Sequence, residues 1–256
     1  MEIFLYTIIF IIGCFFGSFF TLAVYRIPRK EDILIKHSYC PNCNHKLGFL
    51  DLFPVLSYIF LMGKCRYCKK KIRPRYFILE IFSGLTFLMY AMSIKQNVFE
   101  LNIVYLAFSY IYMSVLFIIA GIDKENNNVD KNVLTFGLAV ETIYIIYECI
   151  LNNIDIYRYV MYLFFIAILL LCSVIVLKKH KKQKYLIEIL FLSLYIIIFS
   201  GSIIYVLTII LTLLSIAFYR LFKKKQKKLQ IPIGFFMSIS NIIIIIVTNF
   251  ICNYIM

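Results

Sequence analysis

The chain has 256 residues, of which 62% are hydrophobic and only 16% are charged. Soluble domains average about 45–50% apolar and about 25% charged residues, so this composition excludes an ordinary soluble globular protein. The formal net charge of +14 would suit a nucleic-acid partner, but the basic residues are placed along the chain as membrane-topology signals. The sequence therefore predicts a membrane protein that binds no nucleic acid.

Apolar stretches of membrane-spanning length recur along the chain. A helix needs about 17–25 mostly apolar residues to span a bilayer, and this length predicts an all-α polytopic fold with about eight transmembrane helices. The apolar run from Tyr185 to Phe222 is too long for one span, so we divide it at the sequence SGS (Ser200 to Ser202). The first stretch has no cleavage site, which predicts a retained helix rather than a signal peptide. The expected helices are roughly 3–25, 76–94, 102–122, 133–151, 157–177, 185–199, 203–221 and 232–253.

The basic residues gather in every second connection between these helices. Of the 27 lysines and arginines, 25 lie in the segments 26–75, 123–132, 178–184 and 220–228. The predicted helices bring these four segments to the same side of the membrane, and the positive-inside rule makes that side cytoplasmic. The basic runs then act as topology anchors beside membrane lipid. We expect a multi-pass protein of the inner (plasma) membrane.

Four cysteines of the first long loop form two C-x-x-C pairs, Cys40 with Cys43 and Cys65 with Cys68, with 21 residues between the pairs. Two such turns can direct four thiolates to one point, as in tetrahedral zinc sites. Four protein ligands leave no open position, so the zinc would be structural. The alternatives are four unbonded cysteines or two disulfides, and a reducing cytosol disfavours the disulfides. The segment FLDLFPVLSYIFLMG between the pairs is too short to span, which predicts an interfacial or re-entrant helix.

Three acidic residues lie near the cytoplasmic ends of predicted spans: Glu80, Asp123 and Glu188. A carboxylate inside or at the mouth of a span is costly, so such a residue predicts a functional role. Three acids at similar depth would build an acid/base site. The alternatives are a helix-capping role for Asp123 and, for Glu188, an ion pair with Lys182 or Lys184.

Several motifs together resemble the bacterial prepilin peptidases, the type IV leader peptidases. The similarity begins at GSFFTLAVYRIP (Gly17 to Pro28) and continues through both C-x-x-C pairs, LDLFPVLSYIF and RPRYFILEIFSGLTF, which contains Glu80. It resumes at AGID, which contains Asp123, and ends at IPIGFFMSIS (Ile231 to Ser240). The resemblance implies an enzyme that cleaves the leader of type IV prepilins or pseudopilins at the cytoplasmic face. It also implies methylation of the new N-terminus by S-adenosylmethionine.

The resemblance further implies an aspartic peptidase with two aspartates, and Asp123 matches the first of them. Two adjacent carboxyl groups do not readily both ionise, so one acts as an acid while the other activates water. The second motif, of Gly-x-Gly-Asp-x-Lys type, aligns with QKYLIEIL (Gln183 to Leu190), which contains no aspartate. Either Glu188 supplies the second carboxylate, or Asp130 is recruited, or peptidase activity is lost and a role in methylation, substrate binding or assembly remains. A zinc-stabilised membrane scaffold without chemistry is a further alternative.

The sequence thus predicts three parts of the chain. Residues 1–25 form the first transmembrane helix, residues 26–75 form a cytoplasmic zinc-binding loop domain, and residues 76–256 form a transmembrane helical domain that resembles an aspartic peptidase. The predicted catalytic residue is Asp123, with Glu188 and Glu80 as further candidates. The predicted metal ligands are Cys40, Cys43, Cys65 and Cys68.

Overall fold

The computed structural model describes residues 2–33, 37–94, 103–151, 184–222 and 230–254, together with Val160 and Phe164. In these residues the regular structure is helical, apart from two isolated β-bridges in the cysteine loop. Six helical segments of the described chain are long and apolar enough to cross a membrane. The all-α polytopic fold is therefore confirmed, while the predicted span 157–177 lies outside the described residues except at two positions.

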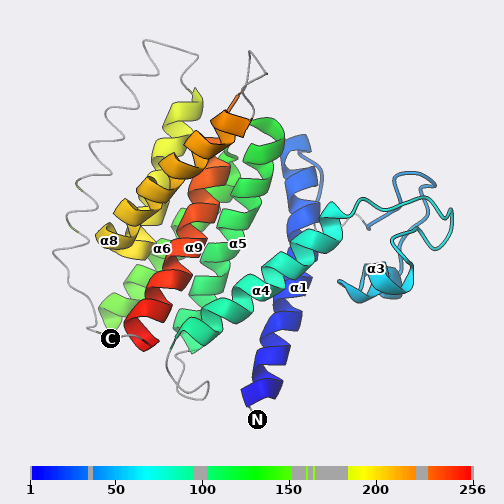
Figure 1. Cartoon of the computed structure of the whole chain (residues 1–256), viewed down its shortest axis with the longest axis horizontal. Coiled ribbons are helices and arrows are strands. Elements are labelled where there is room, and N and C mark those ends of the chain that lie inside the picture. Colours follow the sequence, from blue (N-terminus) through cyan, green and yellow to red (C-terminus); the bar gives the residue numbers. More distant parts are fainter. Residues whose placement is uncertain are drawn as a thin grey trace. The chain divides into compact units, whose positions relative to one another are not determined.

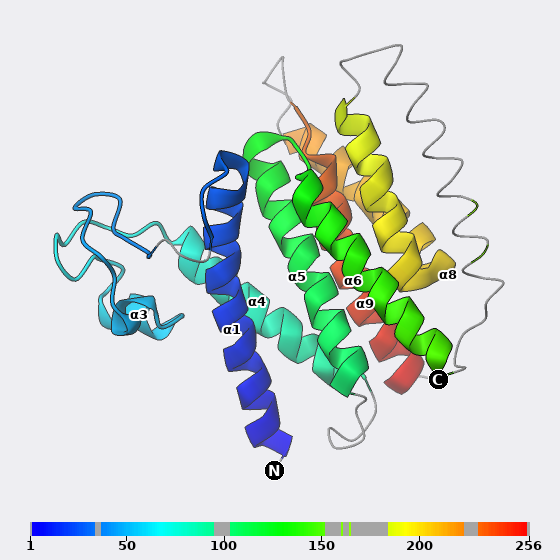
Figure 2. The same ribbon diagram turned by 180° about the vertical axis from the view of Figure 1, so that it is seen from behind.

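The chain divides into two compact units, and the first comprises Met1–Asn102 and Asn249–Met256. Its two long helices cross each other, as both ribbon views show (Figures 1 and 2). Three short helices lie between them in sequence. The helices of this unit, apart from the last residues of α9, are α1 (Glu2–Arg26), η1 (Ile27–Arg29), α2 (Phe49–Leu52), α3 (Leu56–Phe60) and α4 (Arg75–Ser93).

Glycines let α1 pack directly on the backbone of α4. A Cβ atom added to Gly13 would lie 2.8 Å from the Cα atom of Gly84, and one added to Gly17 would lie 2.7 Å from the Cα atom of Glu80. Non-bonded carbon atoms do not approach so closely, so a side chain at either position would force the helices apart. Small residues spaced four apart commonly serve this purpose in membranes, because lipid supplies no hydrophobic force between helices. The sequence analysis did not identify this interface.

Replacing Gly17 by leucine is expected to destabilise unit 1, because the new side chain meets the α4 backbone rather than a flexible side chain. Overpacking of this kind costs about 1–3 kcal/mol or more. Thermal unfolding of the purified protein in detergent measures the effect, with Phe19→Leu on the exposed side of α1 as the matched control. An unfolding midpoint of Gly17→Leu equal to that of the control would contradict the close helix contact.

The second unit comprises Ile103–Thr248, and its helices run side by side (Figures 1 and 2). Its longest helical segment contains Gly201 with φ 80° and ψ 171°, which is not helical. Glycine adopts such angles readily because it has no Cβ atom, so the predicted division of this run at SGS is confirmed. The helices of the unit are α5 (Ile103–Asn126), α6 (Lys131–Ile150), α8 (Lys184–Phe222) and most of α9 (Ile233–Tyr254).

A buried hydrogen-bond network joins three helices of unit 2. The hydroxyl of Tyr112 on α5 donates to Oδ1 of Asn241 on α9 at 2.7 Å. Nδ2 of Asn241 donates to the hydroxyl oxygen of Thr208 on α8 at 3.1 Å. All three side chains are buried, and polar groups in an apolar surrounding are costly unless they are paired. The network therefore fixes the relative register of α5, α8 and α9.

Candidate functional site

The two C-x-x-C segments fold into the same backbone turn. The N–H of Asn44 donates to the carbonyl oxygen of Cys40 at 2.8 Å, and the N–H of Lys69 donates to that of Cys65 at 3.0 Å. Asn44 and Lys69 stand at the same place in their turns, and both have left-handed backbone angles, with φ 55° and 58°. The repeated turn directs the sulfur atoms of both pairs toward one point.

The four sulfur atoms are close enough to share one metal ion. The Sγ atoms of Cys40, Cys43, Cys65 and Cys68 all lie within 4.8 Å of one another. A tetrahedral zinc site with Zn–S bonds of about 2.3 Å places its sulfurs about 3.8 Å apart, and the Sγ atoms of Cys40 and Cys68 are 3.9 Å apart. The cysteines in the described ranges form no disulfide. The predicted four-cysteine cluster is confirmed, and it fits a structural metal.

Asp51 on α2 ties the second cysteine pair to the rest of the loop. Its Oδ1 accepts a hydrogen bond from Nε of Arg66 at 2.6 Å, and its Oδ2 accepts from the N–H of Gly48 at 3.1 Å. Burial disfavours the charged form, but the hydrogen bonds from Arg66 and Gly48 outweigh it and hold the pKa of the Asp51 carboxyl below its ordinary value. Because Arg66 directly follows Cys65, this contact holds the second cysteine turn against α2.

Asp123 lies near the end of α5, and its side chain is buried. The helix ends at Asn126, and Asn127 follows in the left-handed conformation that commonly ends helices, with φ 50°. Oδ2 of Asp123 accepts hydrogen bonds from the N–H of Phe235 at 2.9 Å and from the hydroxyl of Tyr185 at 3.1 Å. Phe235 is the third residue of α9, so the carboxylate lies at the N-terminus of that helix. Free N–H groups and the helix dipole favour an anion there.

Tyr185, the second residue of α8, is held by the same helix end. Its hydroxyl oxygen accepts hydrogen bonds from the N–H groups of Ile233 at 2.8 Å and Gly234 at 3.4 Å. Because an N–H group only donates, the tyrosine hydroxyl gives its single proton to Asp123. The other oxygen of that carboxylate, Oδ1, is buried and has no hydrogen-bond partner among the described residues. Oδ1 is therefore the atom that is left for a proton, a water molecule or a substrate.

Gly234 allows α9 to begin this close to Asp123. A Cβ atom added to Gly234 would lie 3.1 Å from Oδ2 of Asp123 and 3.2 Å from Cγ2 of Val129. The sequence IPIG thus supplies N–H donors without a side chain in the way. The sequence analysis used this segment for its resemblance, but it assigned no role to Tyr185 or Phe235. The available signal was a proline at the start of a helix, with a glycine two residues later.

Glu188 is buried within unit 2, with only 2% of its surface exposed. It lies three residues after Tyr185 on α8, and residues three apart share a face of a helix. Tyr185 reaches Asp123 from that face. Both the part of Glu188 in catalysis and its ion pair with Lys182 or Lys184 stay predictions.

The two other acids singled out in the sequence have structural contacts. Oδ1 of Asp130 accepts the N–H groups of Asn132 at 2.9 Å and Val133 at 3.2 Å, so this aspartate caps the start of α6. Glu80 belongs to unit 1, where its Oε2 accepts the N–H of Val55 at 2.8 Å. Glu80 thereby fixes a turn of the cysteine loop to α4, and its catalytic role is an untested prediction.

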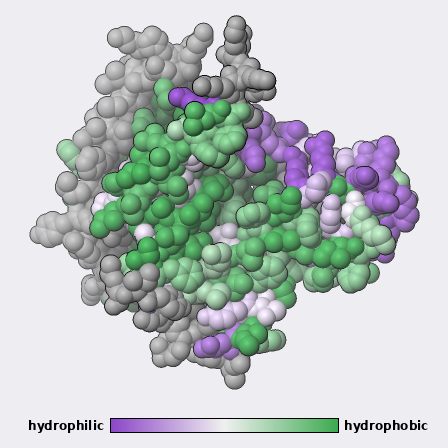
Figure 3. All heavy atoms as spheres, in the orientation of Figure 1, coloured by the Kyte–Doolittle hydropathy of each residue, from purple (hydrophilic) through white to green (hydrophobic). Residues whose placement is uncertain are grey.

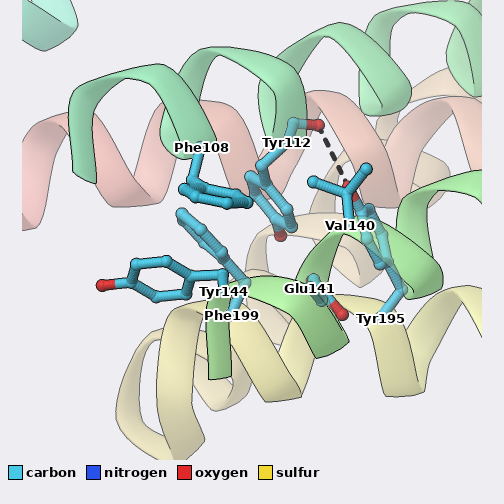
Figure 4. Close-up of a pocket in the computed structure, with 7 residues that line it drawn as sticks. All are labelled: Phe108, Tyr112, Val140, Glu141, Tyr144, Tyr195 and Phe199. Atoms are coloured by element: carbon cyan, nitrogen blue, oxygen red, sulfur yellow. Dashed lines mark hydrogen bonds between the residues drawn. The ribbon is translucent and has the colours of Figure 1, made fainter. Parts of the chain in front are cut away.

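A further buried carboxylate, Glu141, lies in the middle of α6. It is 4% exposed, and neither of its oxygens has a hydrogen-bond partner in the part of the chain that the structure describes. Figure 4 shows it beside a small cavity, of about 10 Å³, among aromatic rings from α5, α6 and α8. The other lining residues are Phe108, Tyr112, Val140, Tyr144, Tyr195 and Phe199.

Replacing Glu141 by leucine is expected to raise the stability of the protein, because a buried polar group without a hydrogen bond costs about 1–3 kcal/mol. The measurement is the midpoint of thermal unfolding in detergent. Glu148→Leu, nearer the end of the same helix and only partly buried, is the matched control and should give no such gain. A lower midpoint for Glu141→Leu would mean that the carboxylate makes a stabilising interaction, and would contradict this prediction.

The fold and the site together define a polytopic helical membrane protein with a four-cysteine cluster that could hold a metal ion and with a buried aspartate at a helix N-terminus. Residues 11–94 match the family model described as the Bacterial Peptidase A24 N-terminal domain. This segment contains most of α1, the cysteine loop and α4. The resemblance to the prepilin peptidases that the motifs predicted is confirmed.

Curated relatives extend the comparison. The "Prepilin leader peptidase/N-methyltransferase" of Vibrio cholerae is 41% identical over 87 residues, which are 30% of this chain and 34% of that protein. The protein of the same name in Klebsiella pneumoniae is 30% identical over 123 residues, 46% of this chain and 51% of its own. The "Type 4 prepilin-like proteins leader peptide-processing enzyme" of Escherichia coli O78:H11 is 27% identical over 122 residues, which are 41% of this chain and 45% of that protein.

The chain thus spans between about a third and a half of the length of these relatives. No solved structure matches it. The match to the family model ends at residue 94, before Asp123.

Proposed function

We propose that this protein cleaves the leader of type IV prepilins or pseudopilins at the cytoplasmic face of the inner membrane and then methylates the new N-terminus. The observation that carries this proposal is the carboxylate of Asp123. Its Oδ2 is held by Phe235 and Tyr185, and its Oδ1 is buried without a hydrogen-bond partner in the described residues. A carboxylate that is fixed through one oxygen and available through the other suits a general base. The names of the relatives support the choice of substrate.

In the proposed reaction, Asp123 removes a proton from a water molecule, and the oxygen of that water attacks the scissile carbonyl carbon. The tetrahedral intermediate collapses when the C–N bond breaks and the leaving amine takes a proton, which we assign to the protonated carboxyl of Glu188. Two carboxyl groups in different protonation states do this work in aspartic peptidases. Tyr185 acts as a positioning residue, because it holds Asp123 in one orientation.

Methylation would follow on the amine that cleavage frees. The resemblance implies S-adenosylmethionine as the donor, which, when bound, would supply the methyl group for this amine. The relatives named "N-methyltransferase" support this second step.

We further propose that the four cysteines bind zinc and that their loop is cytoplasmic. Four thiolates at tetrahedral spacing favour zinc, and a closed set of ligands favours a structural role. The segments that hold 25 of the 27 basic residues include this loop and the connection that begins at Asp123. The positive-inside rule supports the cytoplasm as their common side.

Co-expression with a prepilin or pseudopilin from the same genome tests the proposed function. Mass spectrometry of the pilin N-terminus is expected to show loss of the leader and addition of a methyl group. An intact leader with the wild-type protein would contradict the peptidase proposal. Leader removal without methylation would contradict only the second step.

A further inference from the structure

The segment between the two cysteine pairs exposes an unusual amount of apolar surface for a loop. We call Phe49–Met62 the wedge; it contains α2, α3 and the turn between them. Four of its large apolar side chains are mostly exposed, namely Phe49 (73%), Leu50 (71%), Phe60 (78%) and Met62 (83%). In Figure 3 hydrophobic residues lie where Figure 1 places α3, beside polar residues of the same loop. Exposed apolar patches mark surfaces that contact a partner or a membrane.

Contacts inside unit 1 place the wedge alongside α1, away from the basic end of that helix. The ring of Phe53 packs edge-on against the ring of Phe15 on α1, with centroids 5.3 Å apart. Phe15 precedes Arg26, the last residue of α1, by eleven positions, which is about 16 Å along a helix. Half of a bilayer's hydrocarbon core is about 15 Å thick. When α1 spans the membrane, this contact lies at the depth of the acyl chains.

The backbone of the wedge suits that depth, although it is not one regular helix. Irregular backbone at membrane depth is tolerated only where the protein satisfies its polar groups. At the turn, Pro54 has no N–H group, and the N–H of Val55 donates to Oε2 of Glu80 on α4 at 2.8 Å. The N–H of Ser57 donates to the carbonyl oxygen of Phe53 at 3.0 Å. Glu80 thus accepts the hydrogen bond of the Val55 N–H group, which has no water to bind at that depth.

Positive charges follow the wedge directly in sequence and match the headgroups of anionic lipid. A juxtamembrane cluster of basic residues is attracted to the negative surface of such a leaflet. We propose that the wedge inserts as a re-entrant segment into an anionic phospholipid leaflet, where its exposed side chains contact acyl chains. The basic residues that would lie among the headgroups are Lys64, Lys69, Lys70 and Lys71, while Arg66 neutralises Asp51 of the wedge through their ion pair.

The chain contains no tryptophan, so a single introduced tryptophan reports on one position. Phe60→Trp places the probe on the wedge. Phe82→Trp on the exposed side of α4 is the lipid-facing control, and Asn42→Trp in the first cysteine turn is the control outside the membrane. Each full-length variant is reconstituted into vesicles of phosphatidylglycerol and phosphatidylethanolamine whose acyl chains carry bromine, a short-range quencher. Thermal unfolding confirms that each variant is folded.

The tryptophan of Phe60→Trp is expected to be quenched by the brominated chains to the same extent as that of Phe82→Trp, and to be shielded from aqueous iodide. The tryptophan of Asn42→Trp should be quenched by aqueous iodide and only weakly by the brominated chains. When phosphatidylcholine replaces phosphatidylglycerol, quenching of Phe60→Trp is expected to fall, while that of Phe82→Trp stays constant.

Iodide quenching of Phe60→Trp equal to that of Asn42→Trp would overturn the proposal, because the wedge would then face water. Shielding that disappears when the protein is diluted in lipid would also overturn it, because a second copy of the chain would then cover the wedge. None of these readouts depends on peptidase activity, so failure here and failure of the proposed function are separate results.

Discussion

Asp123→Asn is expected to lower the rate of leader cleavage by about 10²–10⁴-fold, the usual contribution of a positioned general base. Asparagine has nearly the same shape as aspartate, and its amide oxygen can still accept the hydrogen bonds of Phe235 and Tyr185. The substitution therefore removes the base while it preserves the contact between α5 and α9. Co-expression with the prepilin, followed by the ratio of cleaved to uncleaved pilin over time, measures the loss.

Asp130→Asn is the matched control for this experiment. Asp130 caps α6 through its Oδ1, and asparagine caps helices about as well as aspartate, so cleavage should stay near the wild-type rate. Cleavage at the wild-type rate by Asp123→Asn would contradict the proposed mechanism. A strong loss in Asp130→Asn would instead favour recruitment of this residue as the second acid.

Two further variants separate the roles assigned around Asp123. Tyr185→Phe removes the hydrogen bond to the charged Asp123, worth about 1.5–3 kcal/mol, together with those from the N–H groups of Ile233 and Gly234. Cleavage should slow by at least about 10- to 100-fold. Glu188→Gln removes the proposed acid and should cost as much as Asp123→Asn. Cleavage that survives Glu188→Gln would contradict the pairing of Asp123 with Glu188. It would leave the role of Asp123 as the base intact.

Cys65→Ser is expected to abolish metal binding and to unfold the cysteine loop. Structural zinc sites contribute about 10–16 kcal/mol of apparent binding free energy in small domains, and that energy is coupled to folding. Cys65 is buried, and its carbonyl oxygen anchors the second turn through the N–H of Lys69. Metal analysis of the purified protein should show zinc in the wild type and almost none in the variant. Limited proteolysis should cut residues 26–75 faster.

Cys149→Ser is the control for the loss of a thiol as such, because Cys149 is exposed on α6 and lies outside the four-cysteine cluster. It should keep the wild-type metal content and proteolysis pattern. Full metal content in Cys65→Ser would contradict the site. A different metal in the wild type would correct only the assignment to zinc.

Glu80 illustrates a residue whose contact partner is distant in the sequence. Its place inside a predicted span indicates function, because an ionisable side chain there is costly. The structure gives it a definite contact, the N–H of Val55 in the turn of the wedge. That contact suffices to explain a carboxylate at this depth. The sequence alone did not reveal it, because 25 residues separate the two partners.

The sequence by itself determined the membrane class, most of the helices, the four-cysteine cluster and the position of Asp123 at a helix end. These features depend on local properties: the length of an apolar run, the two-residue gap in C-x-x-C, and the point where a span meets polar residues. Each is encoded in one segment of the sequence or, for the cysteine cluster, in two segments that carry the same motif.

Only the tertiary structure decided which atoms complete the site. Tyr185 and Phe235 hold Asp123 from 62 and 112 residues away, and no local pattern relates such distant positions. The contact of the α1 glycines with α4 could not be predicted from the sequence either, because the need for a glycine depends on which backbone lies next to it. Helix propensity and hydropathy are properties of single segments. Hydrogen bonds between helix ends and direct backbone contacts depend on how the segments pack together.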